Sequence, residues 1–159
     1  MNEVEVSVEG IGTPPWLERA RSYALAVLAR LGKDNWELSL LLCDDSFIRG
    51  LNRQYRDRDE ATDVLSFEQG DSFTTPEGES RFLAGDIVVS LEALKRNAED
   101  FGISQDEELR RLIVHGILHL TGMDHEDLDP SKPMLALQEE LLRELDAASG
   151  GPGRGGAIL

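Results

Sequence analysis

All three histidines of the chain lie within one short stretch, His115-Gly-Ile-Leu-His119-Leu-Thr-Gly-Met-Asp-His125. His115 and His119 are four positions apart, so on a helix they share a face, one turn from each other. Gly122 can end that helix and turn the chain back, which would bring His125 toward the first two. Imidazoles that converge in this way bind a divalent metal ion. The stretch therefore predicts a metal site on His115, His119 and His125.

Neutral imidazoles suit Zn²⁺ and also bind Ni²⁺, Cu²⁺ or Fe²⁺. If the protein supplies only these ligands, a coordination position stays open for water, and the metal lowers the pKa of that water toward ~7. Such a site is catalytic. Two alternatives stay open. The histidines could be ordinary packed or exposed residues, or a structural zinc ion could take a fourth ligand from Asp124, Glu126 or Asp127.

The spacing His-x3-His-x2-Gly-x2-His is that of the metzincin zinc proteases, with one difference. A metzincin has glutamate directly after the first histidine as its general base, whereas this chain has Gly116 there. Peptide hydrolysis by the metzincin mechanism therefore lacks its proton acceptor. The motif indicates a metal-dependent hydrolase rather than a standard protease, and it leaves the general base unidentified.

The elements that must position this motif can be read from the hydrophobic pattern. A capping box at Ser104–Glu107 starts a helix that runs to about residue 120 and is apolar nearly all round in its second half, as is typical of a buried helix. Residues 69–81 are polar and predict a mobile loop or hairpin connection. The other elements are strands at about 4–8, 36–42, 63–67 and 83–90, and helices at about 17–31, 46–55, 90–101 and 134–145.

This order favours an α+β (α/β-like) fold: one small mixed sheet of about four strands, about five flanking helices, and a central apolar helix carrying the histidine motif. The strand at 36–42 is apolar on both faces at its end, so we expect it to be central. We expect a single catalytic domain over 1–148 and a Gly-rich disordered tail over 149–159.

Composition limits the environment and the partners. No apolar stretch reaches the ~18 residues of a membrane span, and the first residues lack the features of a secretory signal, so a cytoplasmic protein is expected. The single cysteine, Cys43, excludes an internal disulfide and is expected to be a buried strand residue. The net charge of −15 opposes general binding to phosphate backbones, so a nucleic-acid partner would need a local basic patch.

Three arginines, Arg49, Arg53 and Arg56, are spaced so that they line one face of the helix predicted at 46–55 and its end. A guanidinium binds phosphate through two parallel hydrogen bonds and stabilises developing negative charge. The alternative is a solvated helix face whose arginines pair with nearby aspartates (Asp45, Asp57 and Asp59).

The histidine stretch resembles the signature His-Gly-x-Leu-His-Leu-x-Gly-x-Asp-His of the YbeY family, bacterial metal-dependent endoribonucleases of rRNA maturation and ribosome quality control. Two other parts of the chain resemble the same family. They are Leu51-Asn-Arg-Gln-Tyr-Arg56 with Thr62-Asp-Val-Leu-Ser-Phe67, and Ala84-Gly-Asp-Ile-Val88. The resemblance covers roughly residues 35–145.

The resemblance implies a small mixed sheet surrounded by helices and one metal ion, usually zinc, on His115, His119 and His125. It implies cleavage of single-stranded RNA in maturation of the 16S rRNA 3′ end. Arg56 is then a catalytic candidate together with His115, and Arg56 and, less strongly, Arg53 are candidates for binding RNA. Ribosomal or ribosome-associated proteins are candidate partners, and neither DNA nor a membrane is expected.

Two aspartates have open roles. Asp124, beside His125, could orient an imidazole or cap a turn. Asp86 lies inside an apolar strand and needs a partner if it is buried, either a helix end or the metal site.

Two other functions remain as alternatives to an endoribonuclease. The first is a metzincin-like zinc hydrolase that acts on peptides or small esters, which needs a carboxylate brought to the metal by folding. The second is a non-catalytic ribosome-associated protein with a structural zinc ion, which needs a fourth protein ligand.

Overall fold

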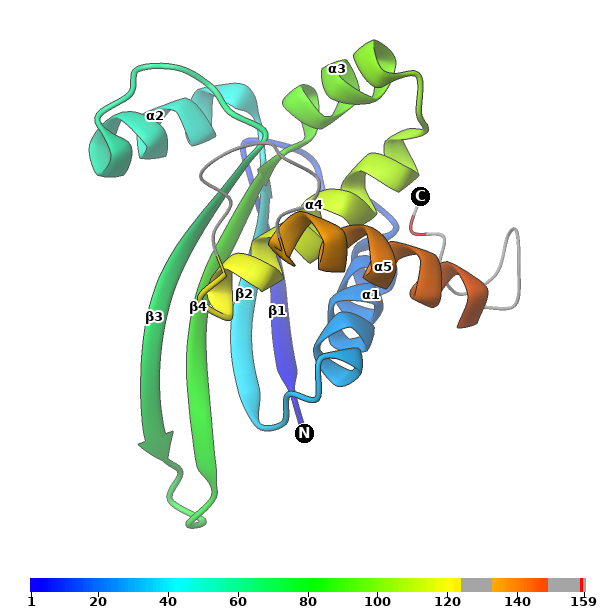
Figure 1. Ribbon diagram of the computed structural model, residues 1–159. Coiled ribbons are helices and arrows are strands. Elements are labelled where there is room, and N and C mark those ends of the chain that lie inside the picture. Colours follow the sequence, from blue (N-terminus) through cyan, green and yellow to red (C-terminus); the bar gives the residue numbers. More distant parts are fainter. Residues whose placement is uncertain (124–132, 149–157, 159) are drawn as a thin grey trace.

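The computed structural model describes residues 1–123, 133–148 and 158 (Figure 1). The described chain forms a four-stranded mixed sheet with helices on both faces, which confirms the predicted α+β fold. Its elements are, in chain order, β1 (Glu3–Glu9), α1 (Leu17–Arg30), β2 (Trp36–Cys43), α2 (Asp45–Arg56), β3 (Val64–Thr74), β4 (Ser80–Ser90), α3 (Leu91–Phe101), α4 (Gln105–Leu120) and α5 (Pro133–Ala148).

The sheet has the strand order β1-β2-β4-β3. β1, β2 and β4 run parallel to one another, and β3 pairs with β4 in the antiparallel direction. Parallel neighbours need a crossover, which α1 supplies between β1 and β2. The prediction that the strand at 36–42 is central is confirmed, because β2 lies between β1 and β4. β3 is an edge strand, and the histidine-bearing helix packs beside it.

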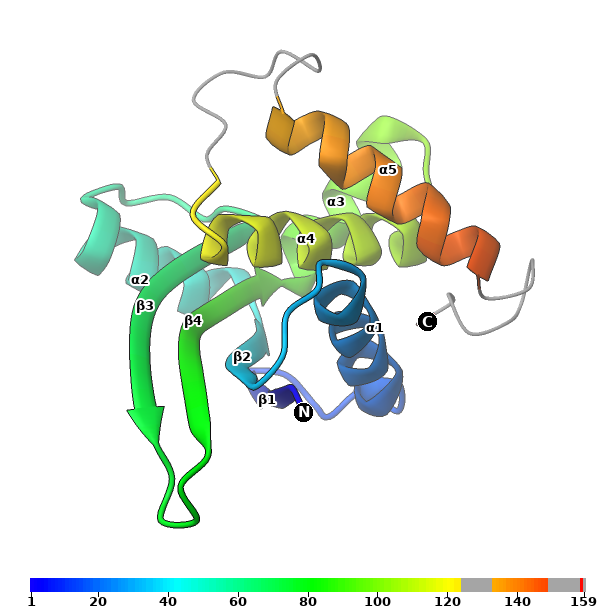
Figure 2. The same cartoon turned by 60° about the horizontal axis from the view of Figure 1, so that its bottom comes forward.

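Alternate residues of the strands build two apolar clusters on opposite faces of the sheet. Leu40, Leu42 and Ile87 point into the larger cluster, which α1, α3, α4 and α5 cover. Figures 1 and 2 show these helices gathered on one side of the sheet and α2 on the other. The smaller cluster contains Cys43 and Val88 and lies under α2. The two faces therefore support the two helices that carry the candidate site residues.

α4 begins as the sequence predicts. The Ser104 side chain accepts a hydrogen bond from the backbone N–H of Glu107 at 3.0 Å, and acidic residues in the first turn interact favourably with the helix dipole. The second half of the helix is almost wholly buried between the sheet and α5. Apolar packing on nearly all sides fixes the direction in which its few polar side chains point.

The hairpin of β3 and β4 differs from the prediction. The expected connection over 69–81 was wrong in extent, since both strands continue through it, and only residues 75–79 form the turn. The turn is closed by hydrogen bonds between Thr75 and Gly78 and between Thr75 and Glu79. Residues 68–74 of β3 are exposed on both faces, so they carry no apolar alternation from which a strand could be predicted. Figure 1 shows this hairpin projecting beyond β1 and β2.

Cys43 is fully buried at the end of β2, as expected, and burial raises the pKa of its thiol to about 12, so it is not a nucleophile at neutral pH. No helix in the described part of the chain is long and apolar enough to span a membrane. Most of the predicted Gly-rich tail lies outside the described residues. Ile158, which is described, is buried, and its N–H donates to the Asp106 carboxylate.

Candidate active site

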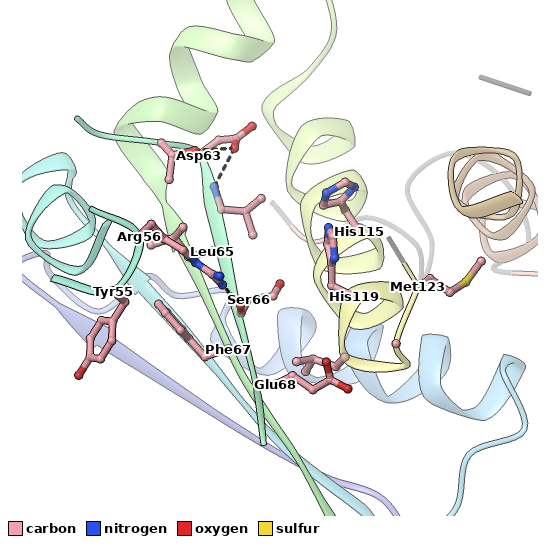
Figure 3. A pocket seen from close by; sticks show the side chains of 14 residues that line it. Tyr55, Arg56, Asp63, Leu65, Ser66, Phe67, Glu68, His115, His119 and Met123 are labelled. Atoms are coloured by element: carbon pink, nitrogen blue, oxygen red, sulfur yellow. Dashed lines mark hydrogen bonds between the residues drawn. The ribbon is translucent and has the colours of Figure 1, made fainter. Parts of the chain in front are cut away.

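A pocket of about 890 Å³ opens between the C-terminal half of α4 and the edge strand β3 (Figure 3). The residues that line it come from the end of α2, the start of β3 and the end of α4. They are Tyr55, Arg56, Thr62, Asp63, Val64, Leu65, Ser66, Phe67, Glu68, His115, His119, Leu120, Gly122 and Met123. The structure thus brings two histidines and one arginine of the prediction to the same cavity.

His115 and His119 lie one helical turn apart on the face of α4 that lines the pocket. Their ring centroids are 4.8 Å apart and the rings meet edge to face at 71°. Both side chains are half-buried. Two imidazoles at one pocket wall fit a transition-metal ion by donor chemistry and spacing. Within residues 1–123 and 133–148 no group of three metal-ligating side chains is found, and His125 and Asp124 lie outside the described residues.

The glycine after the first histidine faces the sheet. A Cβ atom at Gly116 would lie 2.7 Å from Cγ2 of Ile87 on β4, closer than such atoms approach. The position that carries the general base in a metzincin is therefore packed against an apolar strand residue. A glutamate there would have no path to the pocket.

Gln138 on α5 is a site residue that the sequence analysis missed. Its Oε1 lies 2.8 Å from Nδ1 of His115, and its side chain is buried. A sequence signal exists, because Gln138 stands on the same helix face as Met134 and Leu141, which are both buried. A polar side chain on a buried stripe must find a partner, but the sequence does not say which.

Arg56 ends α2 and reaches the pocket across the β3 edge. Its Nη2 donates to the carbonyl oxygen of Ser66 at 2.8 Å, and its guanidinium carbon lies 5.4 Å from the centre of the Phe67 ring. The exposed Tyr55 packs edge to face on the same ring, with 5.4 Å between centroids. No ion pair of Arg56 occurs among the described residues, so its charge is not neutralised by a neighbouring carboxylate.

The other two arginines of α2 separate from Arg56. Arg49 donates to both carboxylate oxygens of Asp59, at 2.9 and 3.2 Å, and this bond lowers the pKa of Asp59. Arg53 is exposed and does not line the pocket. The pairing expected for a solvated helix face thus applies to Arg49, whereas Arg56 is held at the cavity.

Two carboxylates line the pocket. Asp63 accepts hydrogen bonds from the Val64 N–H at 2.8 Å and from the Asn97 amide at 3.0 Å, so it stabilises the start of β3. Glu68 is exposed, and within the described part of the chain its side chain has no hydrogen bond or ion pair. Asp86, whose partner was left open, accepts from the Ser39 hydroxyl on β2 and does not line the pocket.

Fold and pocket together define a class of protein: an α+β domain in which a buried helix presents a pair of histidines at the edge strand of a four-stranded sheet. A family model described as endoribonuclease YbeY matches residues 13–146. The chain belongs to the YbeY family, and the resemblance found in its motifs is confirmed.

Similar proteins agree with this assignment. Endoribonuclease YbeY of Treponema denticola is 58% identical over 126 residues, which cover 79% of this chain and 81% of its own. Endoribonuclease YbeY of Treponema pallidum (strain Nichols) is 46% identical over 144 residues, covering 91% and 90%. The solution structure of TM1509 from Thermotoga maritima has a TM-score of 0.60 at 27% identity and covers 95% of this chain and 99% of its own.

Proposed function

We propose that the protein is a metal-dependent endoribonuclease that cleaves single-stranded RNA during rRNA maturation, at the 16S rRNA 3′ end, and in ribosome quality control. Membership of the YbeY family supports RNA cleavage and the role in rRNA processing. The proposed location of the site rests on one observation: His115, His119 and Arg56 line the same pocket. These residues come from α4 and α2, which no local feature of the sequence links.

The residues proposed to hold one zinc ion are His115, His119 and His125. The position of His115 and His119 one helical turn apart at the pocket wall supports their role, and His125 rests on the sequence motif. When bound, the metal lowers the pKa of a coordinated water and polarises a phosphoryl oxygen. His115 and His119 contribute by fixing where this happens, because both belong to one rigid, buried helix.

Arg56 is proposed to hold the scissile phosphate and to stabilise the charge that develops on it. The bond to the Ser66 carbonyl uses Nη2 and fixes the direction of the guanidinium, and the group's other N–H donors have no partner among residues 1–123 and 133–148. A guanidinium held in place before the reaction stabilises a transition state without the cost of ordering it.

Single-stranded RNA is favoured by the aromatic rings beside Arg56. Tyr55 is 59% exposed at the pocket mouth and is supported from the side by Phe67. An exposed ring of this kind stacks with an unpaired base, whereas a base inside a duplex offers no free face.

Glu68, the exposed carboxylate of the pocket, is the proposed acceptor for the proton of the attacking water.

The two alternatives have less support. A metzincin-like hydrolase is less favoured because the matching family model and the similar proteins are described as endoribonucleases, and because the usual metzincin general-base position is Gly116, packed against Ile87. A non-catalytic protein with a structural metal does not need an arginine held at a cavity without an ion pair among the described residues, as Arg56 is. Ribosome-associated proteins as partners and a cytoplasmic location remain part of the proposal, since they follow from a role in rRNA processing.

The test combines metal analysis with RNA cleavage by the wild type, His115→Ala and Arg56→Ala. We expect one zinc per wild-type chain, loss of metal and activity in His115→Ala, and loss of activity with retained metal in Arg56→Ala. An Arg49→Ala variant is the matched control for Arg56, because Arg49 lies on the same helix but pairs with Asp59. Cleavage that neither His115→Ala nor Arg56→Ala reduces would refute the proposal.

A further inference from the structure

The contact between Gln138 and His115 joins the helix that carries the histidines to the helix that covers it. Nδ1 of His115 and Oε1 of Gln138 are 2.8 Å apart, a full hydrogen bond between α4 and α5. Gln138 is only 6% exposed, so water does not compete for this bond. A carbonyl oxygen only accepts, so the His115 nitrogen facing it must carry the hydrogen.

The orientation of the Gln138 amide is supported by its neighbours. Glu139 holds a two-point ion pair with Arg111, at 3.1 and 3.0 Å. This ion pair lowers the pKa of Glu139. It fixes the turn of α5 that carries Gln138, whose amide oxygen faces His115. Arg111 stands one turn before His115 on α4, so the Arg111–Glu139 and His115–Gln138 contacts both lie in the interface between α4 and α5.

We propose that Gln138 is a positioning residue for metal binding: by accepting from Nδ1–H of His115 it selects the tautomer whose Nε2 carries the lone pair and holds the ring toward the pocket. A free neutral imidazole exchanges between both tautomers and rotates about its side-chain bonds. A hydrogen bond that fixes the tautomer and the ring orientation beforehand removes the free-energy cost of ordering the ring when the metal binds. Hydrogen-bond partners of this kind therefore change metal affinity by about 10–100-fold.

This inference rests on the proposed metal site but does not depend on RNA being the substrate. It also assigns a role to α5 beyond covering the core. The middle of α4 and the first half of α5 are held together by the Arg111–Glu139 pair and the His115–Gln138 bond. A shift of α5 along α4 would therefore move His115.

The first experiment measures zinc affinity by competition with a chromophoric chelator after metal removal. Gln138→Met keeps the length and removes the acceptor, and we expect the Kd to rise about 10–100-fold. Gln138→Glu keeps an acceptor and adds charge that raises the basicity of the ring, so its Kd should equal or fall below that of the wild type. Gln54→Met, on the exposed side of α2, is the matched control and should not change the Kd.

The second experiment reads the tautomer directly in the metal-free protein by long-range ¹H–¹⁵N correlation at a pH where histidine is neutral. His115 should be in the Nδ1–H form in the wild type and in Gln138→Glu, and in a mixture in Gln138→Met. Thermal unfolding of the metal-free variants separates misfolding from a local effect.

Three results would overturn the inference. They are an unchanged Kd in a folded Gln138→Met variant, an Nε2–H tautomer of His115 in the wild type, and zinc binding that His115→Ala does not weaken. If zinc affinity depends on Gln138 but RNA is not cleaved, the inference stands and the proposed function fails. The two can therefore be told apart.

Discussion

Arg56 shows how one residue can be fixed by contacts that no sequence pattern contains. Its place at the end of α2 is predictable, because Asp44 caps the start of the helix and Asp57 adopts the left-handed conformation that ends it. The direction of its guanidinium is not predictable, since the Ser66 carbonyl and the Phe67 ring belong to the edge strand β3. The role of Arg56 thus depends on geometry as well as charge.

Arg56→Lys therefore tests geometry separately from charge. Lysine keeps the positive charge, but its compact ammonium cannot bond the Ser66 carbonyl and bind a phosphate in the two-point manner of arginine. We expect kcat/KM on a single-stranded RNA to fall by about 10²–10³ for Arg56→Ala, and Arg56→Lys to recover only a small part of that loss. Full recovery by lysine would mean that charge alone matters. Unchanged zinc content serves as the control.

Gly116 is a residue whose small size positions the histidine helix. Adding a methyl group there gains about 1 kcal/mol in helix propensity but forces Ile87 to move, at a cost of about 1–3 kcal/mol. The net effect of Gly116→Ala is then a fall of up to about 2 kcal/mol in the free energy of unfolding, which urea titrations measure. Gly50→Ala is the matched control, because a Cβ there meets nothing within 4 Å. That variant should be as stable as the wild type or more stable, and a Gly116→Ala protein equal to it would contradict the argument.

The helix α4 carries a buried carboxyl group, Glu108, which lowers the stability of the fold at neutral pH. Glu108 is 2% exposed, and burial, followed by the nearby charge of Asp63, raises the pKa of its carboxyl above the usual value of 4.5. A carboxyl whose pKa is raised in the folded state contributes stability at low pH. That contribution is lost as the pH rises from the unfolded-state value through the folded-state value.

Glu108→Gln should therefore change the pH profile of stability in a defined direction. The variant removes a buried charge, so its free energy of unfolding should exceed that of the wild type near pH 7. This advantage should shrink as the pH falls to 4.5 and below. Urea unfolding at several pH values measures it. Glu99→Gln, at an exposed position of α3, is the control, and an advantage that is constant with pH would argue against the burial effect.

Element prediction from the sequence succeeded where burial imposes a pattern and failed where it does not. The second half of α4 and the end of β2 are mostly buried, and apolar runs with caps or turns predicted both elements. The outer halves of β3 and β4 are strands only because they pair with each other, and exposed partners leave no periodicity. The same holds for the pocket. The histidine pair was predictable from its helical spacing, whereas the roles of Gln138 and Ser66 depend on contacts between elements that the sequence does not show.

For the whole molecule, the net charge of −15 must be reconciled with an RNA substrate. Most arginines in the described chain are held in ion pairs, among them Arg49, Arg81, Arg110 and Arg111. Arg53 and Arg56 have no ion pair among the described residues. Because Arg53 and Arg56 are the arginines of this kind on α2, beside the pocket, we expect few phosphate contacts there.

The salt dependence of RNA binding measures the number of phosphate contacts. For single strands, each phosphate contact contributes about −0.7 to the slope of log Kobs against log salt, so two contacts give about −1.4. We expect a slope no steeper than about −2 for the metal-free protein on single-stranded RNA, and a shallower one for Arg56→Ala. Fluorescence anisotropy over a salt series supplies the data. A slope steeper than about −4 would require a basic surface that this molecule does not show in its described part.

Ser66 on β3 lies between Arg56 of α2 and the histidine helix α4, and it contacts both. Its carbonyl oxygen accepts from Arg56, while its hydroxyl lies 3.5 Å from the carbonyl oxygen of Gly116 on α4. Leu65 and Phe67, on either side, point into the cluster under α2. Because side chains alternate along a strand, deleting one residue between Asp63 and Ser66 would exchange the two faces. Length changes in the outer hairpin at 75–79 leave this spacing untouched. We therefore expect related proteins to vary in loop length at the hairpin tip, and to carry substitutions but no insertions or deletions in the segment from Asp63 to Phe67.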